Sequence, residues 1–219
     1  MKSTTAILLR CSLIFSLATL ANASIWTEQN AGASIARADV TQGLGPLTDI
    51  FGALTNTTTG ADMYEIYITN PNTFSAISTG NTKKPVVDPA LYLFDAAGNG
   101  LFGNDNISGS NKQADLPAGT LTGLQPGLYF LLIAPSGHLP DDKHGNSIFG
   151  NITGKTGVFT GSGVLKNYGG TPSGDDAGKG YDIQLTGATF AVPEPATLGF
   201  TVLGIALVGW RSRRRSRQA

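Results

Sequence analysis

The sequence predicts an all-β fold, an antiparallel β-sandwich or jelly roll, flanked by an N-terminal signal helix and a C-terminal transmembrane sorting helix. Between the two ends, short β-rich runs are separated by Gly, Asn, Asp and Pro, which is typical of strands joined by turns. Glycine accounts for 29 of the 219 residues and charged residues for only 14%. Ordinary soluble domains have about 7% glycine and about 25% charged residues, so coiled coils and other long-helix folds are excluded.

The pattern of apolar residues places nine strands in the body. Tyr64, Ile66 and Ile68 alternate with polar or amphipathic neighbours, so they are expected to share one buried face of a strand. Residues 128–134 are nearly all apolar, as in a central strand that is covered on both faces. The expected strands are 47–54, 62–69, 74–79, 90–95, 100–104, 120–124, 127–134, 156–165 and 181–186.

Residues 1–23 have the three parts of a secretory signal peptide. Lys2 and Arg10 precede an apolar run, and Ala21 and Ala23 form the A-x-A step at which cleavage is expected. A short buried helix and a lipoprotein signal at Cys11 are the alternatives. Cleavage would remove Cys11, the chain's one cysteine, so the exported protein would have no disulfide.

The C-terminal residues 192–219 are predicted to contain a transmembrane helix at 196–210. Its 15 residues span about 22 Å as a helix, which is short for a bilayer core of about 30 Å. A cluster of arginines follows and is expected to stop the chain in the cytoplasm, so that the body faces the periplasm. The membrane-stop residues are Arg211, Arg213, Arg214, Arg215 and Arg217.

The order of Val192-Pro193-Glu194-Pro195, an apolar stretch and an arginine cluster resembles the PEP-CTERM sorting signal. Tails of this kind are also labelled as the C-terminal domain of ice-binding proteins. The resemblance implies recognition by an exosortase, a membrane-embedded cysteine protease that processes its substrates at the motif, in bacteria that make extracellular polysaccharide. An ordinary single-span anchor with a chance Pro-Glu-Pro is the alternative.

The body, residues 24–191, resembles the bacterial pre-peptidase C-terminal family, which implies a β-sandwich attached to a secreted protein. The stretches that carry the resemblance are 47–52, 62–68, 88–95, 98, 104–106, 124–133 and 181–185. Residues 136–180 depart from it, because they form a 45-residue Gly-rich loop insertion with 12 glycines. Long loops in compact domains are usually functional, so we expect any specific activity to lie there.

Charge excludes a nucleic-acid partner. Residues 24–192 contain 8 basic and 14 acidic residues, for a net charge of −6. A body of that sign repels phosphate backbones, and its sequence has no basic stripe interleaved with aromatic residues.

Asp95, Asn99 and Asp105 are candidate oxygen ligands for calcium, and Asp88 and Asn106 could join them. The segment lacks the acidic residues of an EF-hand loop, and Asp and Asn also favour turns by bonding to their own backbone. Turn formation is therefore the favoured interpretation. No other cofactor is expected.

The sequence does not predict an enzyme. It has no G-x-S-x-G or H-E-x-x-H motif, and its G-x-G-x-x-G at 98–103 is followed by turn residues rather than a helix. Ser136, His138 and Asp141 could form a triad only in principle, because residues so close in sequence rarely converge. His138 and His144 could bind a metal ion, but their spacing fits no common metal site. We therefore expect both histidines to be solvated loop residues.

The function hypothesis is a non-enzymatic surface or extracellular-matrix protein. Its partners would be an exosortase, the membrane at least transiently, and extracellular polysaccharide. The chain would pass through an inner-membrane intermediate and reach the cell surface or matrix. The alternative is a carbohydrate-, calcium- or ice-binding module held at the surface, which would use the 136–180 loop or a flat Thr-bearing sheet face.

Overall fold

The computed structural model describes residues 24–54, 60–80, 82–172, 176 and 178–193. The predicted signal peptide with Ala21 and Ala23 lies outside the described residues. So do Glu194, Pro195, the 196–210 helix and the arginine cluster.

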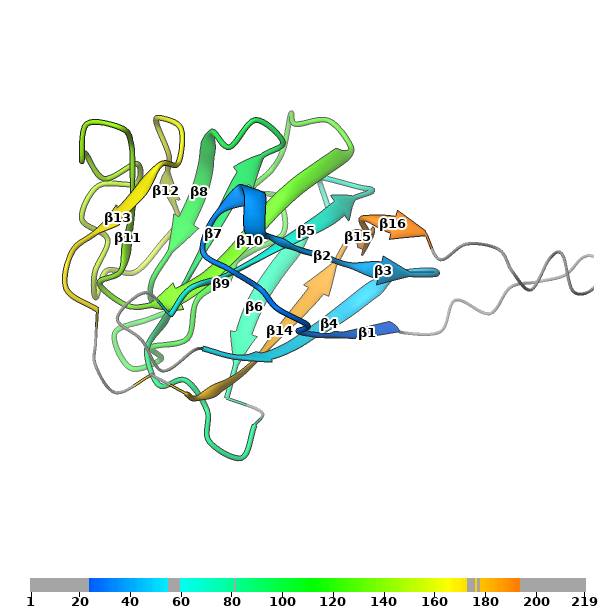
Figure 1. Cartoon of the computed structure of the whole chain (residues 1–219), viewed down its shortest axis with the longest axis horizontal. Coiled ribbons are helices and arrows are strands. Elements are labelled where there is room, and N and C mark those ends of the chain that lie inside the picture. Colours follow the sequence, from blue (N-terminus) through cyan, green and yellow to red (C-terminus); the bar gives the residue numbers. More distant parts are fainter. Residues whose placement is uncertain (1–23, 55–59, 81, 173–175, 177, 194–219) are drawn as a thin grey trace, which may run out of the picture.

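The body is a sandwich of two sheets that face each other across a hydrophobic core, which confirms the predicted all-β class (Figure 1). The five-stranded sheet has the order β1 (Ser24–Thr27), β4 (Leu47–Ala53), β14 (Gly180–Thr186), β6 (Ser75–Thr79) and β9 (Asp115–Leu116). The main path of the seven-stranded sheet is β12 (Phe159–Thr160), β8 (Gly100–Asn104), β7 (Pro89–Asp95), β10 (Gly127–Pro135), β5 (Asp62–Ile68) and β15 (Ala188–Phe190). Its seventh strand, β2 (Asp39–Val40), shares the free edge of β5 with β15.

The sheets are mixed rather than purely antiparallel. β1 pairs in parallel with β4, and β2 pairs in parallel with β5. Between β1 and β2 the chain crosses from one sheet to the other through the 3₁₀ turn η1 (Ile35–Arg37). This crossing lets the N-terminal segment add one short strand to each sheet. The predicted all-β sandwich is confirmed, but the predicted antiparallel pairing does not extend to these two strands.

The core between the sheets follows the predicted alternation. Tyr64, Ile66 and Ile68 are completely buried against strands of the opposite sheet, whereas Tyr67 on the other face of β5 is exposed. Ile50 of β4 and Ile183 of β14 lie in the same core cluster. The period of two along β5 thus assigns each side chain to its face.

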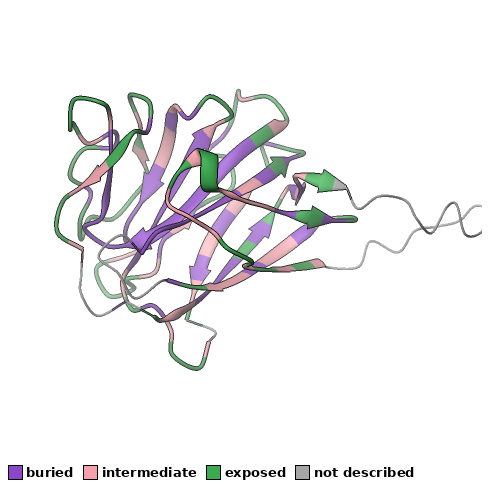
Figure 2. Cartoon of the chain, viewed as in Figure 1, coloured by how far each residue is buried: buried purple, intermediate pink, exposed green. Residues whose placement is uncertain are grey.

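A second hydrophobic cluster covers the outer face of the seven-stranded sheet. It joins Tyr92, Phe94 and Leu132 of that sheet to buried side chains of the 136–180 insertion, namely Leu139, Ile148, Phe149, Ile152 and Leu165. β7 and β10 are consequently buried along most of their length (Figure 2), as predicted for β10. The described part of the expected Gly-rich loop insertion is therefore a packed layer.

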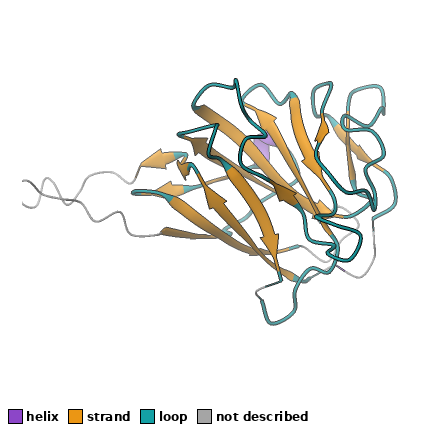
Figure 3. Ribbon diagram, turned by 180° about the vertical axis from the view of Figure 1, so that it is seen from behind, coloured by secondary structure: helices purple, strands orange, loops and turns teal. Residues whose placement is uncertain are grey.

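The insertion contains its own strand pair, β11 (Leu139–Asp141) with β13 (Asn167–Gly169). Long connections around this pair make up much of one end of the molecule (Figure 3). The remaining pair, β3 (Gln42–Gly43) with β16 (Val192–Pro193), is parallel and lies at the far end from β11 and β13 (Figures 1 and 3).

Two predicted strands were wrong. Residues 120–124 form turns, because the Thr120 and Thr122 hydroxyls donate to the carbonyls of Pro117 at 2.6 Å and Gly119 at 2.8 Å. Such local bonds offer the backbone an alternative to a sheet. In 156–165 the ladder is limited to β12 at residues 159–160, with isolated bridges at residues 156 and 164.

Candidate functional site

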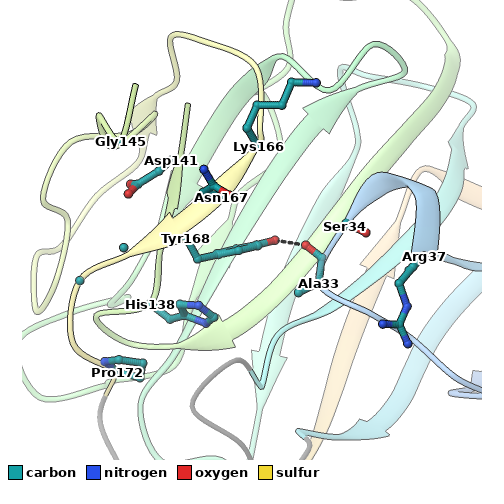
Figure 4. A pocket seen from close by; sticks show the side chains of 12 residues that line it. Ala33, Ser34, Arg37, His138, Asp141, Gly145, Lys166, Asn167, Tyr168 and Pro172 are labelled. Atoms are coloured by element: carbon teal, nitrogen blue, oxygen red, sulfur yellow. Dashed lines mark hydrogen bonds between the residues drawn. The ribbon is translucent and has the colours of Figure 1, made fainter. Parts of the chain in front are cut away.

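A pocket of about 740 Å³ opens where the insertion meets the N-terminal segment (Figure 4). Its walls come from three stretches of chain: 33–37 around η1, 138–145 with β11, and 166–172 with β13. The antiparallel pairing of β11 with β13 fixes the last two stretches relative to each other. The packed layer beneath them, which includes Leu139 and Leu165, holds this wall on the sheet.

His138 and Tyr168 form the aromatic part of the wall. Their ring centroids are 4.6 Å apart, and Figure 4 shows the two rings one above the other. His138 is only 4% exposed, and its Nδ1 has no hydrogen-bond partner among the described residues. Burial lowers the pKa of His138 below its ordinary value, so the imidazole is neutral at pH 7. The prediction that His138 is a solvated loop residue was wrong.

Tyr168 also ties the insertion to the N-terminal segment. Its hydroxyl donates a hydrogen bond to the Ala33 carbonyl, which is drawn as the dashed line in Figure 4. Burial raises the pKa of Tyr168 well above its ordinary value, so the phenol stays protonated and can donate. One side chain therefore closes the pocket between two segments that are 135 residues apart in the sequence.

The rim of the pocket is cationic in a body whose net charge is negative. Arg37 and Lys166 are exposed, line the pocket and form no ion pair with a described residue. Figure 4 shows them on different sides of the Tyr168 ring. Asp141, on the strand that pairs with β13, is 8% exposed, and burial and then the charge of Asp142 raise its pKa. Cationic, amide and aromatic groups together suit a polar ligand with both charged and apolar faces.

The residues considered for a catalytic triad do not assemble into one. Ser136 donates its hydroxyl hydrogen to Oδ2 of Asp105 at 2.8 Å. The Nδ1 of His138 forms no hydrogen bond with any residue that the structure describes. A working triad needs a serine bonded to the base and a base oriented by a third group. His144, the second predicted histidine, is exposed in the turn after Asp142.

The three calcium candidates are divided between two places. The Asp95 carboxylate accepts hydrogen bonds from the Ala97 and Asn99 backbone N–H groups and from the Asn99 side chain, at 2.7–2.9 Å. This is the favoured turn interpretation. Asp105 follows the other end of β8, about 17 Å away for five extended residues. One ion with oxygen ligands at 2.3–2.6 Å cannot contact all three.

Asp105 instead belongs to a buried polar cluster. It is completely buried, and burial raises its pKa to about 6. With its amide oriented so that the nitrogen faces the surrounding acceptors, Asn106 donates to Oδ1 of Asp105 at 2.9 Å and to Oδ1 of Asp88 at 3.2 Å. Lys112 pairs with Oδ2 of Asp88 at 2.8 Å. Among the described residues, no three His, Cys, Asp or Glu side chains gather closely enough to hold a metal ion.

The start of the predicted sorting motif is part of the folded body. Val192 and Pro193 form β16, in register with Gln42 and Gly43 of β3. The Val192 N–H donates to the Thr41 carbonyl at 3.1 Å. This pairing could not be predicted from the sequence, because a two-residue strand has no periodicity. Tyr168 and Thr41 were both missed, although an aromatic residue in the polar run Lys166-Asn-Tyr-Gly-Gly170 is a usable signal for a binding surface.

Comparison with known families finds the PEP-CTERM protein-sorting motif at residues 191–215. The predicted sorting signal is thereby confirmed. The match does not reach the body, whose resemblance to the pre-peptidase C-terminal family stays a prediction. No curated protein matches the chain. In the part of the chain that the structure describes, no helix has the length and apolar character needed to cross a membrane.

Proposed function

We propose that this chain, an exported protein by virtue of its PEP-CTERM motif, is a non-enzymatic component of the cell surface or extracellular matrix. An exosortase would recognise the tail while the apolar stretch 196–210 holds the chain in the inner membrane. The sandwich would face the periplasm at that stage. Processing at the motif would then release the body for the surface, where it could meet extracellular polysaccharide.

One observation carries the proposal: the sorting motif begins where the sandwich ends. The match covers 191–215, and β16 at 192–193 is the last described strand. The described residues between Ser24 and the motif form a compact cargo with two hydrophobic clusters. The Ser136 hydroxyl bonds to Asp105, and the His138 Nδ1 has no partner among the described residues, which supports a cargo without hydrolytic chemistry.

Intact mass and fractionation of the native protein test this function. We expect a species that starts near Ser24, lacks the segment after the motif and occurs outside the inner membrane. A Glu194→Ala variant serves as the control, because it alters the motif outside the described strands and should accumulate as the membrane-bound precursor. A mature wild-type protein that keeps Arg211–Arg217 in the inner membrane would make the tail an ordinary anchor and would contradict the proposal.

The pocket favours a second candidate, a saccharide-binding role for the body. The pocket lies where the insertion meets the N-terminal segment, and β16 is not part of its lining. Aromatic rings bind the apolar faces of sugars, while amides and cations bind hydroxyl and carboxylate groups. The matched test is a glycan array with the mature protein, Tyr168→Ala and Tyr67→Ala. Tyr67 is exposed on β5 away from the pocket. Binding that only Tyr168→Ala loses supports the role, and no binding by the wild type contradicts it.

A further inference from the structure

The first half of the sorting motif is a strand of the body. β16 pairs in parallel with β3, so that Val192 lies opposite Gln42 and Pro193 opposite Gly43. Figure 1 shows the pair side by side at the end of the molecule where the described chain ends. Val192 is 44% exposed. The backbone is therefore held although the side chain is accessible.

Thr41 holds this strand in place. The residue is completely buried, and its Oγ1 accepts a hydrogen bond from the Ala191 N–H at 3.0 Å while donating to the Glu65 carbonyl at 2.8 Å. Its own carbonyl accepts the Val192 N–H at 3.1 Å. Glu65 belongs to β5 in the seven-stranded sheet, so Thr41 links the motif directly to the core of the fold.

Almost no chain separates this strand from the apolar stretch. Only Glu194 and Pro195 lie between Pro193 and Ala196. Three extended steps cover at most about 11 Å. A protease that binds its substrate as an added strand needs several extended residues with free backbone groups, and five or six such residues span about 17–20 Å. The free chain alone is too short to supply that length outside the membrane.

We propose that β16 must separate from β3 before the exosortase can bind the motif, and that Thr41 sets how often this happens. The inference rests on the proposed function, since it concerns the processing of an anchored precursor. The body and the protease would compete for the same backbone groups at residues 191–193. The rate of processing would then follow the fraction of molecules in which β16 is unpaired.

A disulfide between the strands tests the separation directly. Gln42 and Val192 are register partners with exposed side chains, and neighbouring strands lie about 4.8 Å apart, within the Cα range of a disulfide. The body has no cysteine of its own. Processing of the Q42C/V192C double variant is followed by pulse-chase in native cells, with and without added reductant. We expect at least a tenfold slower loss of the tail in the oxidised form and recovery in the reduced form.

The Thr41→Val substitution should weaken the attachment of β16, whereas the disulfide strengthens it. Valine has the same shape as threonine but cannot accept a hydrogen bond from the Ala191 N–H, so β16 should separate from β3 more often. Processing should be about fivefold faster, because the net contribution of one hydrogen bond, about 1 kcal/mol, changes an equilibrium constant about fivefold. Thr69→Val is the matched control, because it removes a hydroxyl that donates to the Gly187 carbonyl at 3.0 Å and does not touch residues 191–193. Thermal unfolding checks that both variants remain folded.

The outcomes separate the two proposals. If the wild-type protein is never processed, the proposed function fails. If the wild type is processed but the oxidised double variant loses its tail equally fast, the function stands and the requirement for strand separation is overturned. If a folded Thr41→Val variant is processed at the wild-type rate, Thr41 does not set how often β16 separates from β3.

Discussion

The hydroxyl of Tyr181 donates a hydrogen bond to Oδ2 of Asp62 at 2.7 Å, across the two sheets of the sandwich. Tyr181 lies on β14 and Asp62 on β5, and both are almost completely buried. The Tyr64 hydroxyl bonds to that of Tyr181, so three polar side chains form one chain inside the hydrophobic core. Buried polar networks of this kind fix how two layers meet, because a shifted arrangement leaves a polar group unpaired.

Asp62→Asn should change how stability depends on pH. Burial raises the pKa of Asp62 to about 7. Between pH 4 and pH 7 the folded wild type therefore binds more protons than the unfolded chain, and its free energy of unfolding falls as the pH rises. Each unit of pKa difference corresponds to about 1.4 kcal/mol. Asparagine keeps an acceptor for Tyr181 but has no charge to bury.

Urea unfolding at several pH values measures this effect. We expect the variant to decline less steeply than the wild type between pH 4 and pH 7, because only the part due to Asp105 and the other buried carboxyls remains, and to exceed the wild type by on the order of 2 kcal/mol at pH 8. Ser75→Ala, an exposed hydroxyl deletion on β6, is the control for an unrelated polar change. Parallel pH curves for Asp62→Asn and the wild type would contradict the raised pKa.

The Gly52→Ala substitution should disrupt the hydrogen-bond network of Tyr181, Asp62 and Tyr64 through a steric clash. A Cβ on Gly52 would overlap the hydroxyl end of the Tyr181 ring, which is held in place by Asp62 and Tyr64. Forcing extra volume into a packed core costs about 1–3 kcal/mol. Gly127→Ala is the matched control, because a Cβ there meets nothing within 4 Å and the backbone needs no left-handed conformation. Chemical denaturation should separate the two variants, and equal stabilities would show that the Tyr181 ring can move aside.

Phe149→Ala tests whether the insertion is part of the stable body. The Phe149 ring centroid lies 5.1 Å from that of Tyr92 and 5.6 Å from that of Phe94, and the side chain is buried. Its truncation should cost about 3–5 kcal/mol and should increase binding of a dye that detects exposed apolar surface. Val158→Ala, at a 37% exposed position of the insertion, should change stability by less than about 0.5 kcal/mol. A near-neutral Phe149→Ala would mean that the insertion is a detachable loop.

Where one side of a strand is buried, its sequence was enough to place it. The alternation at Tyr64, Ile66 and Ile68 gave both the strand and its inner face, and the apolar run of β10 indicated a strand covered on both sides. What covers its outer face was not predictable. The apolar residues of the insertion, such as Ile148 and Ile152, are isolated among glycines, and isolated apolar residues have no period from which a layer can be recognised.

The environment of His138 shows a different limit. Its sequence neighbours include two carboxylates and a lysine, which favours an exposed loop. The structure buries it because β13 returns over it, 30 residues later, and the Tyr168 ring packs against it at a tilt of 43°. A contact between residues so far apart depends on the path of the whole insertion. The same applies to Thr41, whose partners lie 24 and 150 residues away.

The position of β14 restricts when this protein can fold. It lies between β4 and β6 in the five-stranded sheet, although it is formed by residues 180–186. An exported chain is made and emerges N-terminus first, so the middle of that sheet stays open until nearly all of the body has crossed the membrane. Until then the edges of β4 and β6 that pair with β14 in the folded protein are free and prone to pairing with other chains. Chaperones that protect exposed strand edges would therefore be most needed in the interval before residues 180–186 cross the membrane.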